Sequence, residues 1–293
     1  VLNTYRYIKL FFFVSYLAFS VIGFTRETGE KLPRVISLSP HITETIYKIG
    51  AGSALVGRTD FCSYPAAAAG VESVGGYLNI DFEKIVQLEP DLIFQFPNPE
   101  NRRKLESLGF KVVDIPNETV AEILDGILRV GSNLKQLTQA QRLCDQIKDT
   151  LKLVTNEGVH RNDSISAILV VGRQRGSLAN IYLAGGDTYL SEIWNVCGGI
   201  NAFQEVDMRY FPVNEEDLLK RRVEAILEFH PAWSPMTEEI INQKKDWGLL
   251  NQMAAVQNNK IFIFTERYFV IPGPRITQVA IKFSEIFKTY RAK

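Results

Sequence analysis

The sequence predicts an α/β protein with two Rossmann-like lobes, each on a mostly parallel sheet, joined by one long connecting helix. Three observations support this fold class. Buried strands alternate with capped helices along most of the chain, as parallel sheets covered by helices require. Residues 80–96 recur, as a pattern, in residues 213–229. The strongest helical periodicity, in residues 138–157, lies between the two copies.

Residues 138–157, TQAQRLCDQIKDTLKLVTNE, are predicted to form the connecting helix. Thr138 is a good N-cap, Gln141 completes a capping box, and Gly158 is a natural stop. Apolar residues recur at steps of three and four, which is typical of a helix with one buried stripe. The positions of this stripe are Leu137, Ala140, Cys144, Ile147, Leu151 and Val154.

The recurring unit predicts one similar lobe on each side of that helix. IDFEKIVQLEPDLIFQF aligns without a gap on VNEEDLLKRRVEAILEF, so that Asp81 matches Asn214 and Glu83 matches Glu216. Each copy reads as a short capped helix that leads into a buried strand. We therefore interpret the chain as four regions: a signal peptide at 1–23, an N-terminal lobe at 33–133, a connecting helix at 134–160 and a C-terminal lobe at 161–293.

The remaining elements follow from local patterns. Ser39-Pro40 starts a helix after the first strand, because serine suits the N-cap and proline the first helical position. The predicted strands are 34–38, 54–57, 92–96, 111–115, 165–171, 180–183, 225–229 and 260–265. The predicted helices begin near residues 40, 82, 100, 119, 187, 215, 237 and 276.

Composition excludes one class of partner. The 293 residues carry 33 basic and 33 acidic side chains, so the formal net charge is zero. No basic block or basic helix face appears, so we expect no nucleic-acid partner. A chain of this length holds two domains of ordinary size.

The first residues have the features of a signal peptide. Arg6 and Lys9 precede the apolar run Leu10–Ile22, which is the length of a signal h-region and shorter than a membrane span. Ala18-Phe19-Ser20 and Val21-Ile22-Gly23 both offer small residues for cleavage. The protein is therefore expected to be secreted, with an uncleaved membrane anchor as the alternative.

Three cysteines are present. In an oxidising compartment two of Cys62, Cys144 and Cys197 could pair, which would leave one over. Cys144 lies on the apolar stripe and is expected to be a core residue. Their spacing fits no zinc site.

Signals for catalysis are sparse. His41 and Glu44 form a His-x-x-Glu pair at a helix start, but no third metal ligand is apparent. His160 and His230 are expected to be solvated. No nucleophile elbow or phosphate-binding loop is present. A metal-dependent secreted enzyme using His41 and Glu44 is one alternative, whereas we expect a protein that is not an enzyme and has no metal ligands or resident cofactor.

Aromatic residues gather in loops that follow strands. Since ligands of open α/β sheets bind beyond the carboxyl ends of strands, two facing lobes would place these aromatics around one cleft. Aromatic walls suit a large, flat, partly apolar ligand. The aromatics assigned to this site are Phe61, Tyr64, Tyr77, Phe96, Tyr182, Phe211 and Tyr268.

Five segments carry a resemblance to a known family. RVISLSPHITETIYKIG, the loop that ends in SYP, GGYLNIDFEKIVQLEPDLI, LESLGFKVV and NVCGGINAF resemble the periplasmic substrate-binding proteins of ABC importers for vitamin B12, ferric siderophores and haem. The resemblance covers roughly residues 33–290. It implies two lobes joined by a long helix, small lobe movements, and a ligand held between the lobes.

The resemblance also implies a ligand and a partner. The ligand is expected to be cobalamin or another corrinoid, with a ferric siderophore or haem as alternatives in the same fold. Five of the aromatics named above, Phe61, Tyr77, Phe96, Tyr182 and Phe211, match the ligand-binding positions of the family. Glu83 and Glu216 match the acidic residues that meet arginines of the membrane permease dimer. A monomer is expected.

A few positions depart from the family or bear on the alternatives. Arg267 and Ile271 stand where an aspartate and an arginine would contact the corrin side chains. Ser284 stands where the disulfide partner of Cys197 would lie, so that bridge is expected to be absent. Tyr77 lies near the position of a tyrosine ligand in haem-binding relatives.

Overall fold

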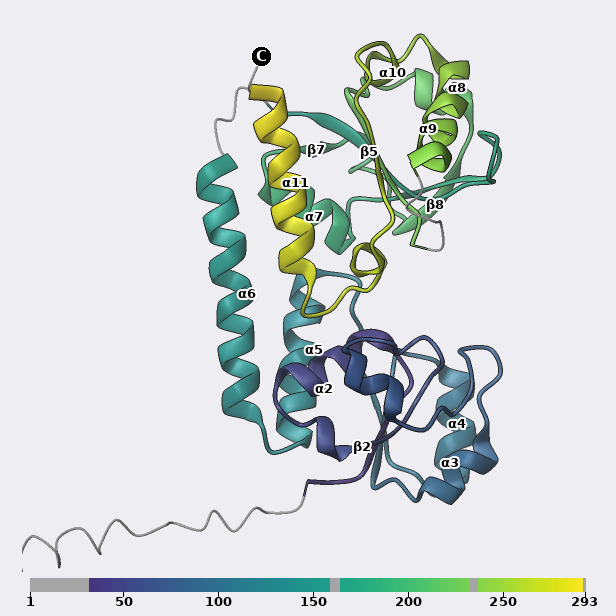
Figure 1. Ribbon diagram of the computed structural model, residues 1–293, viewed down its shortest axis with the longest axis vertical. Coiled ribbons are helices and arrows are strands. Elements are labelled where there is room, and N and C mark those ends of the chain that lie inside the picture. The colour runs from purple at the N-terminus through teal and green to yellow at the C-terminus, as the bar shows by residue number, and fades with distance from the viewer. Residues whose placement is uncertain (1–31, 159–163, 232–236, 292–293) are drawn as a thin grey trace, which may run out of the picture. The chain divides into compact units, whose positions relative to one another are not determined.

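The computed structural model describes residues 32–158, 164–231 and 237–291 (Figure 1). One sheet precedes helix α6 (Leu137–Gly158) along the chain and a second sheet follows it. This arrangement confirms the predicted fold class. The predicted signal peptide and His160 lie outside the described residues.

The first sheet is entirely parallel, with its strands in the order β2-β1-β3-β4. Its two central strands are buried on both faces, which explains their continuous apolar sequences. The strands are β1 (Val35–Ser37), β2 (Leu55–Arg58), β3 (Leu92–Gln95) and β4 (Val112–Asp114). The helices between them and after them are α2 (Pro40–Lys48), α3 (Phe82–Leu88), α4 (Pro99–Ser107) and α5 (Val120–Asn133).

The second sheet is mixed, in the order β10-β9-β5-β6-β8, with β7 beside β5. Strands β10, β9, β5 and β7 are parallel, whereas β6 and β8 are antiparallel to their neighbours. Its strands are β5 (Ser166–Gly172), β6 (Ile181–Ala184), β7 (Ile200–Asn201), β8 (Tyr210–Val213), β9 (Ala225–Phe229) and β10 (Ile261–Phe264). Its helices are α7 (Tyr189–Val196), α8 (Glu215–Leu219), α9 (Thr237–Asp246), α10 (Ala254–Gln257) and α11 (Ile276–Arg291).

The repeated unit forms the same structure in both sheets. The side chain of Asp81 accepts a hydrogen bond from the Lys84 backbone N–H at 2.9 Å, and that of Asn214 accepts one from the Asp217 N–H at 2.9 Å. Strand β3 then lies beside β1, as β9 lies beside β5. The two pairings differ in register by one residue. Val35 lies opposite Leu92 in the first sheet. In the second sheet the residues at the same spacing of 133 along the chain are Ile168 and Ala225, but Ala225 lies opposite Ala167.

Helix α6 runs alongside both α5 and α11 (Figure 1). It begins at Leu137, so Thr138 lies in its first turn instead of at the N-cap as predicted. The turn before it is fixed by a left-handed Lys135 (φ +56°) and by the Gln136 N–H, which donates to Gly131 O at 2.7 Å. A Cβ at Gly131 would lie 2.4 Å from that of Ala140, so the close contact of α5 with α6 requires glycine.

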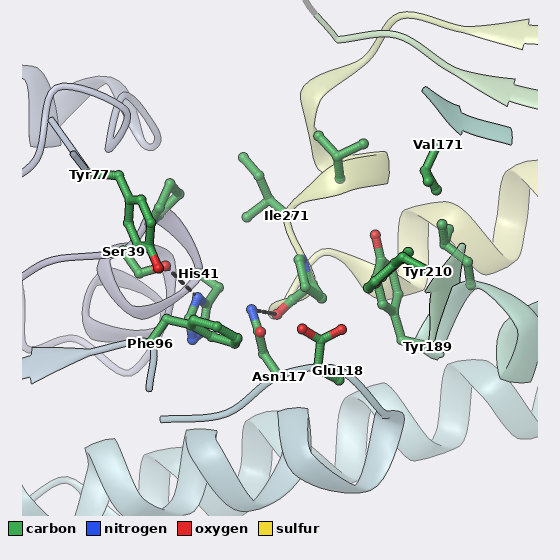
Figure 2. A pocket seen from close by; sticks show the side chains of 14 residues that line it. Ser39, His41, Tyr77, Phe96, Asn117, Glu118, Val171, Tyr189, Tyr210 and Ile271 are labelled. Carbon is green, nitrogen blue, oxygen red and sulfur yellow. Dashed lines mark hydrogen bonds between the residues drawn. The ribbon is translucent and has the colours of Figure 1, made fainter. Parts of the chain in front are cut away.

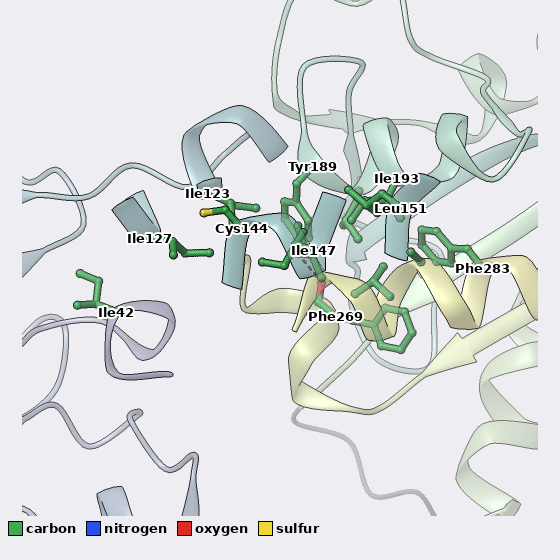
Figure 3. Close-up of a cluster of buried hydrophobic side chains, with 14 of the residues drawn as sticks. Ile42, Ile123, Ile127, Cys144, Ile147, Leu151, Tyr189, Ile193, Phe269 and Phe283 are labelled. Atoms are coloured by element: carbon green, nitrogen blue, oxygen red, sulfur yellow. Dashed lines mark hydrogen bonds between the residues drawn. The ribbon is translucent and has the colours of Figure 1, made fainter. Parts of the chain in front are cut away.

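One hydrophobic core spans both sheets (Figure 3). It joins Phe94 of β3, Ile127 of α5, Ile147 of α6 and Phe283 of α11. Both lobes pack on the buried stripe of α6. Leu137 was wrongly assigned to this stripe, because its side chain in the first turn is 44% exposed. The other five positions, Ala140, Cys144, Ile147, Leu151 and Val154, are buried as predicted.

The three cysteines are all unpaired and buried. Cys144 is a core residue, as predicted. The Sγ of Cys197 lies 3.5 Å from the carbonyl oxygen of Ala280, which precedes Ser284 by one turn of α11. Cys197 is a free thiol. Within the described ranges, no helix is both long enough and apolar enough to cross a bilayer.

Candidate ligand-binding site

Two adjoining cavities lie at the carboxyl ends of the strands. Their volumes are about 380 and 570 Å³, and they share Ser39, Pro40, Tyr77, Val270 and Ile271. The first cavity, called the Glu118 cavity below, is also lined by His41, Phe96, Asn117, Glu118, Val171, Tyr189, Leu190, Tyr210 and Pro272. The second is also lined by Leu38, Thr59, Phe61, Pro231 and Arg267.

The parallel sheets bring these side chains together. Ser39 follows β1, Phe96 follows β3, Asn117 and Glu118 follow β4, and Val171 belongs to the end of β5. Carboxyl ends of parallel strands meet at one edge, which is where α/β proteins bind ligands. Residues far apart in the sequence thus form one wall, and both lobes contribute to it.

Tyr77 has a central position in this site. It lines both cavities and also a third one of about 670 Å³, where Asn79, Asn98, Arg103 and Lys104 are among its neighbours. Its ring is partly exposed. Figure 2 shows it on one side of the Glu118 cavity, with Tyr189 and Tyr210 on the other.

The His41 imidazole is held as a neutral group. Its Nδ1 lies 2.8 Å from Ser39 Oγ, and its Nε2 lies 3.2 Å from the Ile115 carbonyl oxygen. Burial lowers the pKa of His41 to about 4, against the opposing effect of the bond to Ile115. At neutral pH this side chain therefore brings no positive charge to the cavity.

Glu44 is occupied by a different partner. Its two carboxylate oxygens accept hydrogen bonds from Arg275 at 2.8 and 2.5 Å, and the Glu44 side chain is buried. His41 and Glu44 therefore have separate partners and do not form the pair of metal ligands that the enzyme alternative would require. No group of three or more metal-ligating side chains occurs in the part of the chain that the structure describes.

Two tyrosines at the far wall are held as phenols. The Tyr189 hydroxyl donates to the Phe269 carbonyl oxygen, and burial raises the pKa of Tyr189 well above its ordinary value. Burial also raises the pKa of Tyr210, and the neighbouring Glu118 carboxylate raises it further.

The structure separates the predicted aromatics into three groups. Tyr77 and Phe96 line the Glu118 cavity, and Phe61 lines the second cavity. Tyr64 and Tyr268 lie beside Arg275, whose guanidinium carbon is 4.1 and 5.7 Å from their ring centroids. Tyr182 and Phe211 line none of the three cavities described above.

Strand geometry explains the positions of this last pair. Phe211 was expected in a loop, but it belongs to β8 together with Tyr210, and successive side chains of a strand point to opposite faces. Phe211 is buried against Phe203, with ring centroids 5.8 Å apart, whereas Tyr210 is exposed to the cavity. On the neighbouring strand β6, Tyr182 lies opposite Pro212.

The sequence reasoning missed Asn117, Glu118 and Tyr189. Asn117 and Glu118 follow the end of β4, and residues at that position commonly contact ligands in α/β proteins. They were not predicted because only aromatic side chains were assigned to the site. Tyr189 begins α7 and was interpreted only as part of a helix. His230, expected to be solvated, is in fact buried, with its Nε2 2.6 Å from Glu228 Oε1.

The two predicted docking residues occupy equivalent places. Glu83 lies in the first turn of α3 and Glu216 in the first turn of α8, and both are exposed. Glu216 pairs with Lys220 at 2.8 Å on the same helix. The repeat thus presents one carboxylate from each lobe.

Comparison with known proteins identifies the family. A family model described as periplasmic binding protein matches residues 35–268. The chain belongs to the periplasmic binding protein family. Among curated members, the vitamin B12-binding protein of Vibrio parahaemolyticus serotype O3:K6 is 27% identical over 277 residues, which covers 90% of this chain and 93% of the relative. That of Vibrio vulnificus strain YJ016 is 30% identical over 226 residues, covering 71% and 78%.

Solved structures of periplasmic binding proteins share the fold. The periplasmic vitamin B12-binding protein BtuF of Vibrio cholerae superposes with a TM-score of 0.75 at 25% identity, covering 89% of this chain and 99% of that one. The periplasmic heme-binding protein RhuT of Roseiflexus sp. RS-1 gives a TM-score of 0.72 at 19% identity, covering 88% and 100%. These relatives are named for the ligand that they bind and none for a reaction.

Proposed function

We propose that this chain is the substrate-binding protein of an ABC importer. It captures a metal chelate in the cleft formed by the two adjoining cavities and delivers it to a membrane permease dimer. The preferred chelate is cobalamin or another corrinoid. The observation that carries this proposal is the cleft itself, which lies beyond the strand ends and has aromatic side chains from both lobes in its walls. The names of the relatives support the choice of ligand.

The chemistry of the tyrosines limits which of them could bind haem iron. A tyrosine binds ferric haem iron as phenolate, and a raised pKa disfavours that form. Since the pKa values of Tyr189 and Tyr210 are both raised, haem binding would depend on Tyr77. A cobalamin brings its own axial ligands to cobalt and needs only packing and hydrogen bonds from the protein.

Calorimetric titration of the mature chain, from about residue 24, tests the ligand. One-to-one binding of cyanocobalamin establishes the proposal. Binding of hemin without cyanocobalamin moves the assignment to haem and makes Tyr77 the first axial ligand to replace. If neither ligand binds, a ferric siderophore is the remaining chelate, and ferrichrome and ferric enterobactin are the next probes.

Delivery to the permease is proposed to use Glu83 and Glu216. Their equivalent, exposed positions on α3 and α8 suit a dimeric partner that offers one basic site to each lobe. Exposed charges of this kind act mainly on encounter rate and orientation. We expect the double variant Glu83→Lys, Glu216→Lys to leave the dissociation constant of the ligand within about twofold and to reduce uptake by cells at least roughly tenfold.

A matched control carries the same change of charge elsewhere. Glu89 lies after the end of α3, and Glu215 is the exposed neighbour of Glu216. The pair Glu89→Lys, Glu215→Lys should retain uptake. Normal uptake by the first double variant would show that these carboxylates are not the docking contacts.

Two further features of the proposal concern location and assembly. Residues 1–23 are proposed to direct the chain to the periplasm, and the mature protein is proposed to act as a monomer. Fractionation of cells and light scattering of the purified protein measure both. A cytosolic full-length protein, or a stable dimer, would contradict them.

A further inference from the structure

We infer that Glu118 makes the cleft select a chelate whose edge presents amide N–H donors, and reject one whose edge presents carboxylates. This inference rests on the proposed function, because it specifies the ligand of that same site. It concerns the wall of the Glu118 cavity formed by Glu118 itself, which was not among the aromatic residues assigned to the site from the sequence.

The backbone of Glu118 is fixed from both sides. Its N–H donates to Glu122 Oε2 at 2.7 Å, and its carbonyl oxygen accepts from the Tyr189 N–H at 2.6 Å. The side chain, half-buried, lies in the cavity near Tyr189 and Tyr210 (Figure 2). The backbone that carries this carboxylate is therefore already ordered before a ligand binds, and only the side chain has freedom left to lose.

Among the described residues that line this cavity, Glu118 is the one carboxylate and His41 the one basic side chain. With its pKa near 4, His41 is neutral at pH 7. The nearby cation Arg209 does not line the cavity, and its guanidinium bonds Asp187 at 3.1 Å and lies 3.7 Å from Glu122. The wall at Glu118 is therefore negative.

The charge of the second cavity is opposite. Arg267 lines it and donates to Ser63 Oγ at 2.9 Å and to the Phe61 carbonyl oxygen at 3.4 Å. A ligand that spans both cavities then meets an acceptor at one end and a cation at the other. A chelate with amide donors on one edge and a phosphodiester or other acceptor on another edge matches both ends.

A carboxylate edge does not match the Glu118 end. An amide N–H that meets Glu118 forms a charge-assisted hydrogen bond, whereas a ligand carboxylate there meets a like charge in a partly desolvated site. A bond of the first kind is worth about tenfold to hundredfold in affinity. Corrinoids with amide side chains satisfy this requirement, and their hydrolysed carboxylate forms do not.

Two corrinoids that differ in these groups provide the test. Cobinamide carries amides and cobyrinic acid carries carboxylates on the same ring. We expect the wild-type chain to bind cobinamide at least roughly tenfold more tightly than cobyrinic acid at pH 7, and the Glu118→Gln variant to reduce that ratio at least about fivefold. Glu118→Ala should reduce it similarly. Asp125→Asn removes an exposed charge from α5, the helix that follows Glu118, and should leave the ratio unchanged.

The possible results separate this inference from the proposed function. If the wild-type chain binds cyanocobalamin but the ratio is unchanged in folded Glu118→Gln, the inference is overturned and the corrinoid assignment stands. If no corrinoid binds, that assignment fails, and the same ratio is measured between the bis-amide of hemin, whose two propionates are converted to primary amides, and hemin itself. If Glu118→Gln does not reduce that ratio, the inference is overturned for haem as well. It is also overturned if the chain binds neither corrinoids nor haems.

Discussion

At the scale of single residues, Tyr77 is the side chain on which the cleft depends most. It lines all three cavities described above, from a loop that precedes α3. The sequence could indicate Tyr77 because it lies in a loop rich in glycine beside a predicted helix. It could not separate Tyr210 from Phe211, since their assignment depends on β8, a strand recognised only by its pairing with β6.

Replacement of Tyr77 by alanine should therefore weaken ligand binding. We expect the dissociation constant to rise about tenfold to hundredfold, because an aromatic contact and the area that it buries are lost. Tyr182→Ala gives a comparison matched in exposure, since Tyr182 is 46% exposed and Tyr77 is 45% exposed. The cavities predict a small change for Tyr182→Ala. Calorimetry of both variants decides, and an unaffected Tyr77→Ala would remove Tyr77 from the site.

At the scale of elements, the segment between β10 and α11 connects the two lobes. The Asn117 amide donates to the Pro272 carbonyl oxygen at 3.2 Å, and a Cβ at Gly273 would lie 3.0 Å from that of His41. Arg275 reaches Glu44 in α2. The helices and the repeat could be predicted from caps and periodicity, but these contacts could not, because no local pattern specifies which distant carboxylate an arginine meets.

The Arg275–Glu44 pair should stabilise this connection in a way that depends on pH. Burial raises the pKa of Glu44, while its hydrogen bond to Arg275 and the charge of Arg275 lower it. Arg275→Ala removes both lowering effects and leaves a buried carboxylate without its partner, which costs roughly 3 kcal/mol of unfolding free energy. Because the pKa of Glu44 in the folded variant then lies further above its unfolded value near 4.5, the deficit is smallest below that pH and grows as pH rises.

Urea unfolding at pH 5 and pH 8 measures this effect. The difference between wild type and Arg275→Ala should be larger at pH 8. As a control, Arg275→Ala is also made in the Glu44→Gln background, where the carboxylate is absent. The deficit of that double variant relative to Glu44→Gln alone should not depend on pH. Equal deficits for Arg275→Ala at the two pH values would show that the variant loses packing on Tyr64 instead of a charge partner.

At the scale of the whole molecule, the continuous core predicts that the two lobes unfold together. The same cluster contains Phe94 of the first sheet, Ile127 of α5, Ile147 of α6 and Trp194 of α7. A core shared in this way couples the stability of each lobe to that of the other. The repeat in the sequence suggested two similar lobes, but the periodicity of one helix could not indicate that both pack on a common cluster.

The distribution of tryptophans makes this cooperativity measurable. The N-terminal lobe at 33–133 has no tryptophan, so intrinsic tryptophan fluorescence reports on the later part of the chain, where Trp194 and Trp247 are buried. Far-ultraviolet circular dichroism reports on both lobes.

We expect the two urea transitions, one from fluorescence and one from dichroism, to coincide. Ile127→Ala should lower the unfolding free energy from both by about 2–5 kcal/mol because it opens a cavity in the shared core. Leu153→Ala, on the exposed side of α6, should shift neither by more than about 0.5 kcal/mol. A fluorescence transition that stays in place while the dichroism curve divides in Ile127→Ala would mean that the lobes unfold independently, and that the α5–α6 contact does not transmit stability between them.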